Sequence, residues 1–378
     1  MRFLAFLSIL AVSLSAPTMA QASVQTEAKQ AIIVDYDTGT VLFAKNPDQQ
    51  MPTSSMSKVM TLYMVFDALK KGVVKMDDTF LVSEGAWRKG GSKMFVEVNK
   101  RVSVEDLIRG VSVQSGNDAT IVLAEGLSGT EDAFAHAMTA KAKEMGMENS
   151  NFANASGWPD PLHYSTARDL AVLTKHLIQD FPEHYSVFSE KEFTYNNITQ
   201  KNRNPLLFRN MGADGVKTGH TEDGGYGLIG SGMNADGRRV ILVVNGLPSM
   251  SARAQESARL LEWALQGFTN KTLYEADDVV AQAEVVYGKE SSVAFGVQSK
   301  VVLTIPKVSS REIKIEAEYK KPLIAPINKG DEIGTLYVSV PGHEHVTTVP
   351  LIAREDVKAK GFFAKTIAKA KQFFAARS

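Results

Sequence analysis

The sequence predicts an α+β protein: an antiparallel sheet with helices and an inserted helical subdomain, followed by a small all-β sandwich and a C-terminal amphipathic helix. Within residues 23–270, strand-like runs lie near both ends and helical patterns lie between them. Within residues 271–355, short apolar runs alternate with turn residues, which is typical of a sandwich. Within residues 356–378, apolar side chains recur at helical spacing.

Residues 1–22 have the pattern of a secretory signal peptide. Arg2 gives a positive start, and the apolar run over residues 3–12 is too short to span a bilayer. Small residues follow, so we expect cleavage after Ala22, with Ala20 as the alternative. The mature protein is therefore expected to be exported.

Composition excludes several classes of function. The 42 basic and 42 acidic residues cancel, which argues against a general nucleic-acid binder. The absence of cysteine excludes disulfides and thiol chemistry. The seven histidines show no metal-binding spacing, so we expect neither a metal nor a cofactor.

The first part of the mature chain predicts a hairpin and then a helix. Residues 31–36 and 41–45 have the pattern of two strands joined by a turn. Pro52 marks the end of a loop, Ser and Thr residues offer an N-cap, and an almost wholly apolar helix runs to Leu69.

Mainly helical patterns follow. Residues 84–95 are glycine-rich and irregular, and we expect the large Trp87 side chain there to anchor packing. Ser103 resembles an N-cap for a helical stretch that is broken near residues 115–117 and ends at Leu127. Two further helices are predicted at residues 130–146 and 166–180.

The chain then returns to the sheet. Residues 192–211 are irregular or β, and a strand follows that carries Lys217. Residues 224–230 and 239–245 predict two strands that pair across a turn, and residues 251–267 predict a long amphipathic helix. We place the domain boundary near residues 269–276. The predicted sandwich strands are 284–287, 291–295, 301–305, 313–319, 334–340 and 346–351.

Ser55 and Lys58 carry the first chemical signal. Residues three apart share one face of a helix, so the hydroxyl and the amine can meet. A serine becomes a strong nucleophile when a neighbouring base takes its proton, and a desolvated lysine can be that base. A Ser-x-x-Lys pattern alone is weak, because it usually joins a cap to a surface lysine.

Two later stretches strengthen this interpretation. Ser115 and Asn117 flank a glycine, and Lys217, Thr218 and Gly219 form a second short motif. Each motif is weak alone, but their order and spacing resemble the three-part site of the penicillin-recognising serine acyltransferases.

The surrounding residues are similar to the D-alanyl-D-alanine carboxypeptidases among the low-molecular-mass penicillin-binding proteins. Local similarity covers residues 32–39, 107–110, 165–169 and 214–221, and the resemblance extends over nearly the whole mature chain. It implies the fold of β-lactamases and transpeptidases for residues 23–270. It also implies a peptidoglycan stem peptide as substrate and β-lactam antibiotics as covalent inhibitors.

The implied reaction is acyl transfer through a serine ester. Ser55 attacks the carbonyl between two D-alanines, and Lys58 is the base if it is neutral, a state that burial and the nearby Lys217 favour. Ser115 passes a proton towards the leaving nitrogen. Asn117 holds Lys58 and the substrate amide.

The resemblance also implies how substrate binds. Lys217 and Thr218 suit the terminal carboxylate as a charge and a hydroxyl donor. Gly219 leaves room for substrate backbone. The oxyanion hole is placed at the backbone N–H groups of Ser55 and His220, so the His220 side chain is expected only to shape the rim. Arg203 either adds positive field for the carboxylate or forms a surface salt bridge.

Three alternatives remain open. A D,D-endopeptidase would use the same fold to cut cross-links. A class A-like β-lactamase would need a glutamate to activate the deacylating water, and residues 154–164 contain none. A non-catalytic wall-binding protein could retain a relic site, although all the motif side chains are present.

The tail over residues 356–378 predicts a membrane contact. After Asp356 it has no acids, and its cations and phenylalanine pairs suit a helix that lies on anionic lipid. The alternative is that its apolar face packs on the β domain. We expect a peripheral protein on the periplasmic side of the cytoplasmic (inner) membrane. The cations are Lys358, Lys360, Lys365, Lys369, Lys371 and Arg377, and the apolar residues are Phe362, Phe363, Ile367, Ala370, Phe373 and Phe374.

Overall fold

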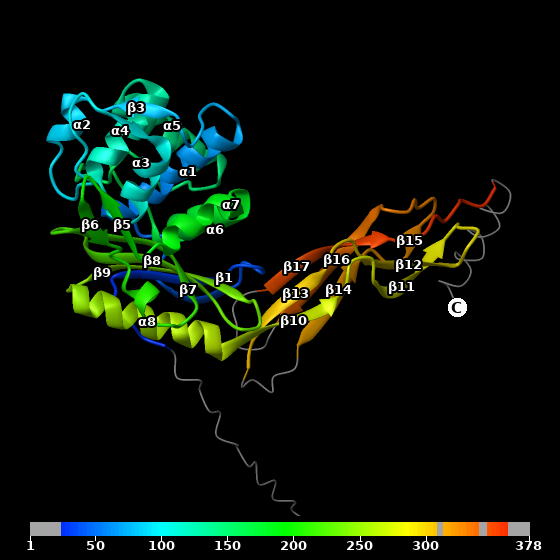
Figure 1. The fold of residues 1–378 in the computed structure, drawn as a ribbon. Helices are drawn as coiled ribbons and strands as arrows, with labels where there is room; N and C mark the ends of the chain where they lie inside the picture. The colour runs from blue at the N-terminus through cyan, green and yellow to red at the C-terminus, as the bar shows by residue number, and fades with distance from the viewer. Residues whose placement is uncertain (1–23, 308–312, 340–345, 362–378) are drawn as a thin grey trace, which may run out of the picture.

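The computed structural model describes residues 24–307, 313–339 and 346–361 (Figure 1). The expected signal peptide and most of the expected terminal helix lie outside these ranges. The described chain forms an α+β unit and a β domain, so the predicted fold class is confirmed except for its C-terminal helix. None of the described helices is long and apolar enough to cross a membrane.

The first unit is built on a five-stranded antiparallel sheet in the order β2-β1-β9-β8-β7. β9 lies at the centre because its apolar run is buried on both faces. Its neighbours come from both ends of the unit, which brings distant segments together. The strands are β1 (Gln30–Asp35), β2 (Val41–Lys45), β7 (Ala213–Thr221), β8 (Gly225–Met233) and β9 (Arg239–Leu247).

Helices cover both faces of this sheet (Figure 1). On one face, α8 (Met250–Gly267) buries Leu260 and Leu261 in a cluster with apolar side chains of the sheet. On the other face lies α6 (Ala167–Asp180), which Thr166 caps by accepting from the Asp169 backbone N–H.

A helical subdomain is inserted between β2 and β7. Its first element is η1 (Ser54–Ser57), a 3₁₀ turn that runs directly into the buried helix α1 (Lys58–Lys70). The other helices are α2 (Glu84–Arg88), α3 (Val104–Ser112), α4 (Asn117–Ser128), α5 (Glu131–Glu144) and α7 (Pro182–Tyr185). The short elements are β3 (Thr79–Leu81), β4 (Arg101–Ser103), η2 (Ser186–Ser189), β5 (Glu192–Tyr195), β6 (Ile198–Lys201) and η3 (Pro205–Phe208).

Two local expectations for this subdomain differ from the structure. Residues 84–95 are not wholly irregular, because the Ser83 hydroxyl accepts from the Ala86 N–H and starts α2. Trp87 does not anchor packing, since 43 % of it is exposed. A short helix that begins at Ser83 turns Ala86 into the core and leaves Trp87 at the surface.

The β domain packs two sheets around Phe295, Leu336 and Leu351. One sheet pairs β10 (Phe268–Tyr274) with β13 (Val301–Pro306), so β-structure begins directly after α8. The other sheet has the order β14-β16-β17-β12-β11-β15. Its strands are β11 (Val279–Val286), β12 (Ser292–Val297), β14 (Lys314–Tyr319), β15 (Leu323–Ile324), β16 (Glu332–Ser339) and β17 (Val346–Ala353).

The expected terminal helix does not begin at residue 356. Val357 and Ile327 exchange two backbone hydrogen bonds of 2.8 and 3.0 Å, and the Lys360 N–H donates to the Tyr287 carbonyl at 2.8 Å. These residues are extended because Val357 is buried in the core of the β domain and their backbone groups pair with that domain. Residues 362–378 lie outside the described chain, so the rest of the helix stays a prediction.

Candidate active site

The nucleophile turn, residues 53–58, places a serine hydroxyl beside a buried amine. Lys58 is fully buried, and its Nζ lies 2.9 Å from the Ser55 Oγ. Nζ also donates to the Asn117 Oδ1 at 2.7 Å and to the Ser156 carbonyl at 2.6 Å. Lys58 therefore faces two carbonyl oxygens, which only accept, and one hydroxyl, which can also donate.

This environment suits a neutral lysine. Burial, followed by the charge of Arg203, lowers the pKa of Lys58 to about 7. A neutral amine has two protons for the two carbonyl oxygens and one lone pair for the Ser55 hydroxyl. At neutral pH a large fraction of the protein thus holds a base next to a nucleophile.

The turn between α3 and α4 supplies the second motif. Ser115 has φ 60°, a left-handed conformation that ends α3 and turns the chain into α4. Ser115 is buried, and Asn117, the first residue of α4, is also buried beside Lys58. The Asn117 Nδ2 donates to the Gly90 carbonyl at 2.9 Å, which fixes the amide so that its oxygen faces Lys58.

The third motif lies on the edge strand β7. Lys217 is 3 % exposed, and its Nζ donates to the Ser115 Oγ at 2.9 Å. Burial, followed by the charge of Lys58, lowers the pKa of Lys217 well below its usual range. Thr218 beside it is buried as well. The three motifs predicted from the sequence thus lie together around one point.

Gly219 allows the strand to approach the nucleophile turn. A Cβ at this position would lie 2.9 Å from the Thr53 carbonyl and 3.1 Å from the Ser54 Cβ. The space beside Gly219 is therefore filled by this protein's own turn, which is a physical reason for glycine besides the expected room for substrate.

A cavity of about 650 Å³ opens onto this site. Ser55, Ser92, Asn117, Trp158 and His220 are among the residues that line it. The two lysines are not among its lining residues; they are buried beside it, with Lys58 at the Ser55 hydroxyl and Lys217 at the Ser115 hydroxyl. A ligand in this cavity would meet Ser55 first.

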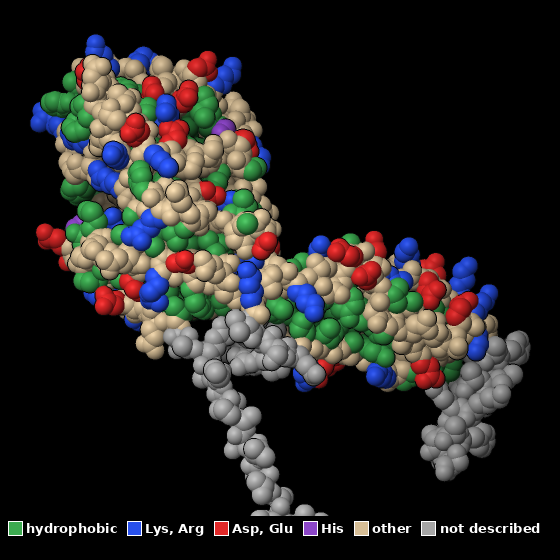
Figure 2. Space-filling view, turned by 60° about the horizontal axis from the view of Figure 1, so that its bottom comes forward, with side chains coloured by type: hydrophobic (Ala, Val, Ile, Leu, Met, Phe, Trp, Pro, Cys, Tyr) green, Lys and Arg blue, Asp and Glu red, His purple; other side chains and the backbone are tan. Residues whose placement is uncertain are grey.

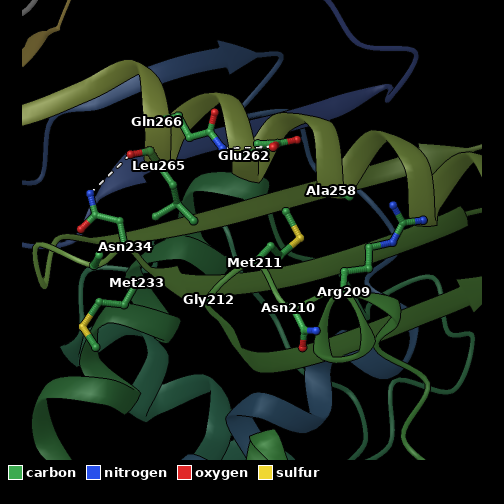
Figure 3. A pocket seen from close by; sticks show the side chains of 11 residues that line it. Arg209, Asn210, Met211, Gly212, Met233, Asn234, Ala258, Glu262, Leu265 and Gln266 are labelled. Atoms are coloured by element: carbon green, nitrogen blue, oxygen red, sulfur yellow. Dashed lines mark hydrogen bonds between the residues drawn. The ribbon is translucent and has the colours of Figure 1, made fainter.

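Another cavity, of about 600 Å³, lies under α8 and is shown in Figure 3. Met211, Met233 and Leu265 form its apolar part, while Glu262 and Gln266 come from the helix. It has no serine or lysine among its lining residues and shares none with the cavity at Ser55. It therefore has no nucleophile for acyl transfer.

The two remaining predicted site residues lie at the rim. The His220 ring is stacked on Tyr226, with the ring centroids 3.9 Å apart. The Arg203 guanidinium donates to the Ser92 Oγ, and its charge contributes to the lowered pKa of both Lys58 and Lys217. No ion pair of Arg203 occurs within the described residues, so the surface salt bridge expected as one alternative is not seen there.

Arg253 on α8 is a site residue that the sequence analysis missed. It is 5 % exposed, and its Nη1 donates to the Gly219 carbonyl at 3.4 Å. Its Nε has no hydrogen-bond partner among the described residues. The available signal was a cation on the buried helix face, because Arg253, Ser257 and Leu260 share that face.

The loop over residues 154–163 lies within the stretch 154–164, which contains no glutamate. Its Asn154 side-chain oxygen accepts from the N–H groups of Ser156, Gly157 and Trp158, which folds the loop tightly. The Ser156 carbonyl that reaches Lys58 comes from this loop. A backbone contact of this kind leaves no side-chain signal in the sequence.

Metal chemistry has no candidate ligand set in the described part of the chain. No group of three or more His, Cys, Asp or Glu side chains is placed there so that it could hold an ion. The chemistry of the site rests on the hydroxyl and amine groups above.

Comparisons with known proteins agree with this geometry. A model of the D-alanyl-D-alanine carboxypeptidase family matches residues 16–249, and a model described as penicillin-binding protein 5, C-terminal domain, matches residues 268–359. The chain is 40 % identical over 368 residues to the D-alanyl-D-alanine carboxypeptidase DacA of Haemophilus influenzae, which covers 95 % of this chain and 93 % of the relative.

Solved structures show the same fold. Penicillin-binding protein 5 from Haemophilus influenzae is similar with a TM-score of 0.81 and 40 % identity, covering 89 % of this chain and 98 % of that one. Penicillin-binding protein D2 from Listeria monocytogenes, solved in an ampicillin-bound form, is similar with a TM-score of 0.59 and 30 % identity. That match covers 64 % of this chain and 98 % of the Listeria chain.

Proposed function

The chain belongs to the D-alanyl-D-alanine carboxypeptidase family, and on this premise we propose that it removes the terminal D-alanine from peptidoglycan stem pentapeptides through a serine ester. The observation that carries the proposal is the contact between the Ser55 hydroxyl and the buried Lys58 amine. Family membership gives the class of bond, and this contact supports Ser55 as the nucleophile and Lys58 as its base.

We propose that acylation begins when Ser55 Oγ attacks the carbonyl carbon between the two D-alanines. The Ser55 proton passes to the neutral Lys58 Nζ, and the carbonyl oxygen becomes an oxyanion between the N–H groups of Ser55 and His220. Each such donor is worth on the order of 3 kcal/mol of transition-state stabilisation. These N–H groups belong to the nucleophile turn and to β7, respectively.

Collapse of the tetrahedral intermediate breaks the bond to the leaving nitrogen, which needs a proton. Ser115 is suited to deliver it, because its Oγ is hydrogen-bonded to the Lys217 Nζ. The proton that Lys58 took from Ser55 replaces the one that Ser115 gives up, so both Lys58 and Ser115 return to their starting protonation before deacylation. A water then attacks the ester, Lys58 takes the water's proton, and Ser55 Oγ leaves and is reprotonated. The stem peptide is released with a new carboxylate.

Substrate binding is assigned to the third motif. The D-alanine carboxylate would be held by Lys217 and Thr218, while Arg203 adds positive field from the rim. Asn117 would hold Lys58 through its Oδ1 and is suited to contact the substrate amide. Gly219 lets β7 lie against the nucleophile turn, so that these groups reach the same substrate.

The direct test compares two substrates. Purified protein is incubated with a stem pentapeptide and, in parallel, with a cross-linked dimer, and D-alanine release and dimer cleavage are followed. We expect the pentapeptide to be cleaved faster. Faster dimer cleavage would instead make the protein a D,D-endopeptidase.

The β-lactamase alternative is disfavoured by the loop over residues 154–163. This loop turns the Ser156 carbonyl towards Lys58, and no glutamate lies in its sequence. A deacylating water therefore has no loop glutamate to activate it, and the Asp160 carboxylate of this loop accepts from the Leu162 N–H at 2.7 Å. We expect a long-lived acyl-enzyme with penicillin, seen as a persistent mass increase; rapid return to the free mass with release of hydrolysed drug would favour the lactamase.

A non-catalytic wall-binding protein with a relic site is the remaining alternative. The buried Lys58 amine in contact with Ser55 disfavours it, because such an arrangement retains the base and the nucleophile together. Failure of purified protein to form any covalent adduct with a fluorescent penicillin would favour this alternative.

We further propose that the protein is exported and acts on the periplasmic side of the cytoplasmic membrane. Residues 1–22 support export, since they have the signal-peptide pattern. The basic residues with phenylalanine pairs in 362–378 support contact with anionic lipid. N-terminal sequencing of the mature protein would identify the cleavage site, which we expect after Ala22 or Ala20.

A further inference from the structure

A buried histidine, His163, joins the 154–163 loop to the nucleophile turn. It is 5 % exposed, and its Nε2 lies 2.7 Å from the Ser57 Oγ. The Ser57 Oγ in turn lies 2.5 Å from the Thr53 Oγ1, and both residues are fully buried. None of the proposed catalytic steps uses this chain of groups.

The hydrogen bonds have a fixed direction. The Ala153 backbone N–H donates to the His163 Nδ1 at 3.2 Å, so Nδ1 accepts and carries no proton. The ring proton is then on Nε2, which donates to the Ser57 Oγ. The Ser57 hydroxyl can then donate its own proton to the Thr53 Oγ1. Burial lowers the pKa of His163 to about 4, so the ring stays neutral in this arrangement near pH 7.

Both ends of this hydrogen-bonded series lie close in the sequence to the reacting groups. Ser57 stands between Ser55 and Lys58 in the nucleophile turn. At the other end, the Ala153 contact closes the base of the loop that brings the Ser156 carbonyl to Lys58. A loss of the imidazole therefore frees the turn and the loop at once.

The loop holds α1 at a second point, which makes its position important. The Ala155 carbonyl accepts from the Thr61 Oγ1 at 2.6 Å, one turn after Lys58. Two successive carbonyl groups thus support the helix that carries the base. Both carbonyls lie within ten residues of His163, and its contact with the Ala153 N–H fixes their spacing from the turn.

We propose that His163 is a positioning residue for the acyl-transfer reaction, holding Ser55 and Lys58 in register by locking the loop to the nucleophile turn. The inference rests on the proposed function. His163 does not itself touch the reacting atoms, because its Nε2 is engaged by Ser57 and its Nδ1 by Ala153. A misplacement of about 1 Å at a reacting group lowers a rate by about 100-fold.

Two substitutions separate positioning from packing. In His163→Gln, the side-chain oxygen can accept from the Ala153 N–H and the amide NH₂ can donate to Ser57. The variant therefore keeps both the acceptor and the donor of the imidazole. His163→Leu fills the space without either hydrogen bond. His136→Leu is the matched control, because His136 on α5 is exposed.

The readout is D-alanine release per active site. Sites are counted by saturation with fluorescent penicillin, so that unfolded protein does not enter the rate. We expect His163→Leu to lower kcat about 100-fold with KM within threefold of the wild type. His163→Gln should return kcat to within about threefold of the wild type, and His136→Leu should leave it unchanged.

A per-site kcat of His163→Leu within twofold of the wild type would overturn the inference, as would a His163→Gln variant as slow as His163→Leu. If His163→Leu does not fold, Ser57→Ala interrupts the same chain at a smaller side chain. It should lower kcat by about tenfold at unchanged KM, and an unchanged kcat would refute the role.

Failure of the proposed function gives a different result. If the wild type releases no D-alanine, the carboxypeptidase assignment fails, and the second-order rate of penicillin acylation becomes the readout for the same variants. That rate depends on Ser55 and Lys58 but not on a stem peptide. We expect His163→Gln to be acylated by penicillin fast and His163→Leu slowly. Equal acylation rates for the two variants would contradict the positioning role.

Discussion

Lys58 and Lys217 are two basic side chains in one buried site. All the hydrogen-bond partners that the structure gives them are neutral hydroxyl, amide or carbonyl groups. Burial without a bonded carboxylate disfavours the charged form, and the charge of Lys58 further lowers the pKa of Lys217. The substrate carboxylate would therefore supply the first direct anionic partner of Lys217.

The pH dependence of acylation follows from Lys58. Because the neutral amine is the active form, kcat/KM should rise with pH and reach half its maximum near pH 7. Arg203 lowers the pKa of Lys58, so Arg203→Gln should move this acid limb to higher pH. Penicillin acylation rates from pH 5 to 9 would show it, with Arg209→Gln as an exposed control. An acid limb that stays in place would exclude Arg203 from control of the base.

A second pH effect concerns stability. The pKa of His163 is lowered from 6.5 to about 4, so the unfolded chain binds more protons than the folded protein between these values. The stabilising effect of neutral His163 is complete above pH 6.5 and falls as pH drops towards 4. Between pH 7 and pH 5 the loss is about 2 kcal/mol of unfolding free energy.

Denaturant unfolding of wild type and His163→Gln at both pH values isolates this contribution, because glutamine does not titrate. The variant should lose about 2 kcal/mol less than the wild type between pH 7 and pH 5. Asp160 and Lys58, the charges that act on His163, are present in both proteins. Equal losses would show that His163 is not held neutral by the fold.

At the scale of elements, the site depends on close approach between the 154–163 loop and the nucleophile turn. Gly157 has φ 77°, and a Cβ on it would overlap the Ser54 carbonyl. Ser54 has φ 50°, so the turn adopts a left-handed backbone at a non-glycine residue. Loop and turn therefore fit together only when Gly157 has no side chain.

Gly157→Ala should separate the loop from the turn. We expect a loss of stability of about 2 kcal/mol or more and a fall in kcat of about 100-fold, since the Ser156 carbonyl moves away from Lys58. Gly146→Ala is the matched control: it has φ 81°, but no atom lies within 4 Å of the added Cβ. Gly146→Ala should lose only the stability that a left-handed backbone costs alanine. Equal effects in the two variants would mean that the close contact between Gly157 and Ser54 is unimportant.

The elements with strong sequence patterns could be predicted from the sequence. The hairpin at residues 31–45, the apolar α1 and the amphipathic α8 follow from periodicity and capping. β10 was missed because most of its residues fall in the stretch 269–276 that was assigned to the domain boundary, and the β5–β6 hairpin was left as irregular or β. Pairing with distant strands, rather than local propensity, determines such short strands.

Much of the candidate site could also be predicted, because most of its functional groups belong to side chains. Ser55, Lys58 and Lys217 stand in motifs that name their chemistry. Backbone groups leave no such signal, so the Ser156 carbonyl could not be found. Arg253 and His163 were missed since their roles depend on which buried neighbour they meet.

At the scale of the whole molecule, polar contacts join the β domain to the sheet. The Thr304 Oγ1 of β13 lies 2.6 Å from the Thr38 Oγ1, and the Asn270 Nδ2 of β10 donates to the Asp35 Oδ1 at 3.2 Å. The buried Asp35 also pairs with Arg238 at 3.0 Å. Figure 2 shows acidic and basic side chains interspersed over the β domain on the face in view, which provides no single-sign surface there for anionic lipid.

We expect membrane contact to depend on the tail, because its basic residues and phenylalanine pairs suit anionic lipid. Truncation after Gly361 keeps the paired residues Val357 and Lys360, so the β domain stays intact. The truncated protein should retain carboxypeptidase activity and fail to sediment with anionic liposomes. Full-length protein should sediment with anionic but not neutral liposomes, and less at high salt. Equal sedimentation of both proteins with anionic liposomes would contradict the anchor.

The central claim is that Ser55, activated by Lys58, forms the ester with the stem peptide. Its most direct test is D-alanine release from a pentapeptide by wild type and Ser55→Ala at equal concentrations of folded protein, with the exposed Ser189→Ala as control. We expect Ser55→Ala to lower D-alanine release by about 10⁴-fold or more, while Ser189→Ala matches the wild type. Equal rates for wild type and Ser55→Ala would remove Ser55 from the mechanism.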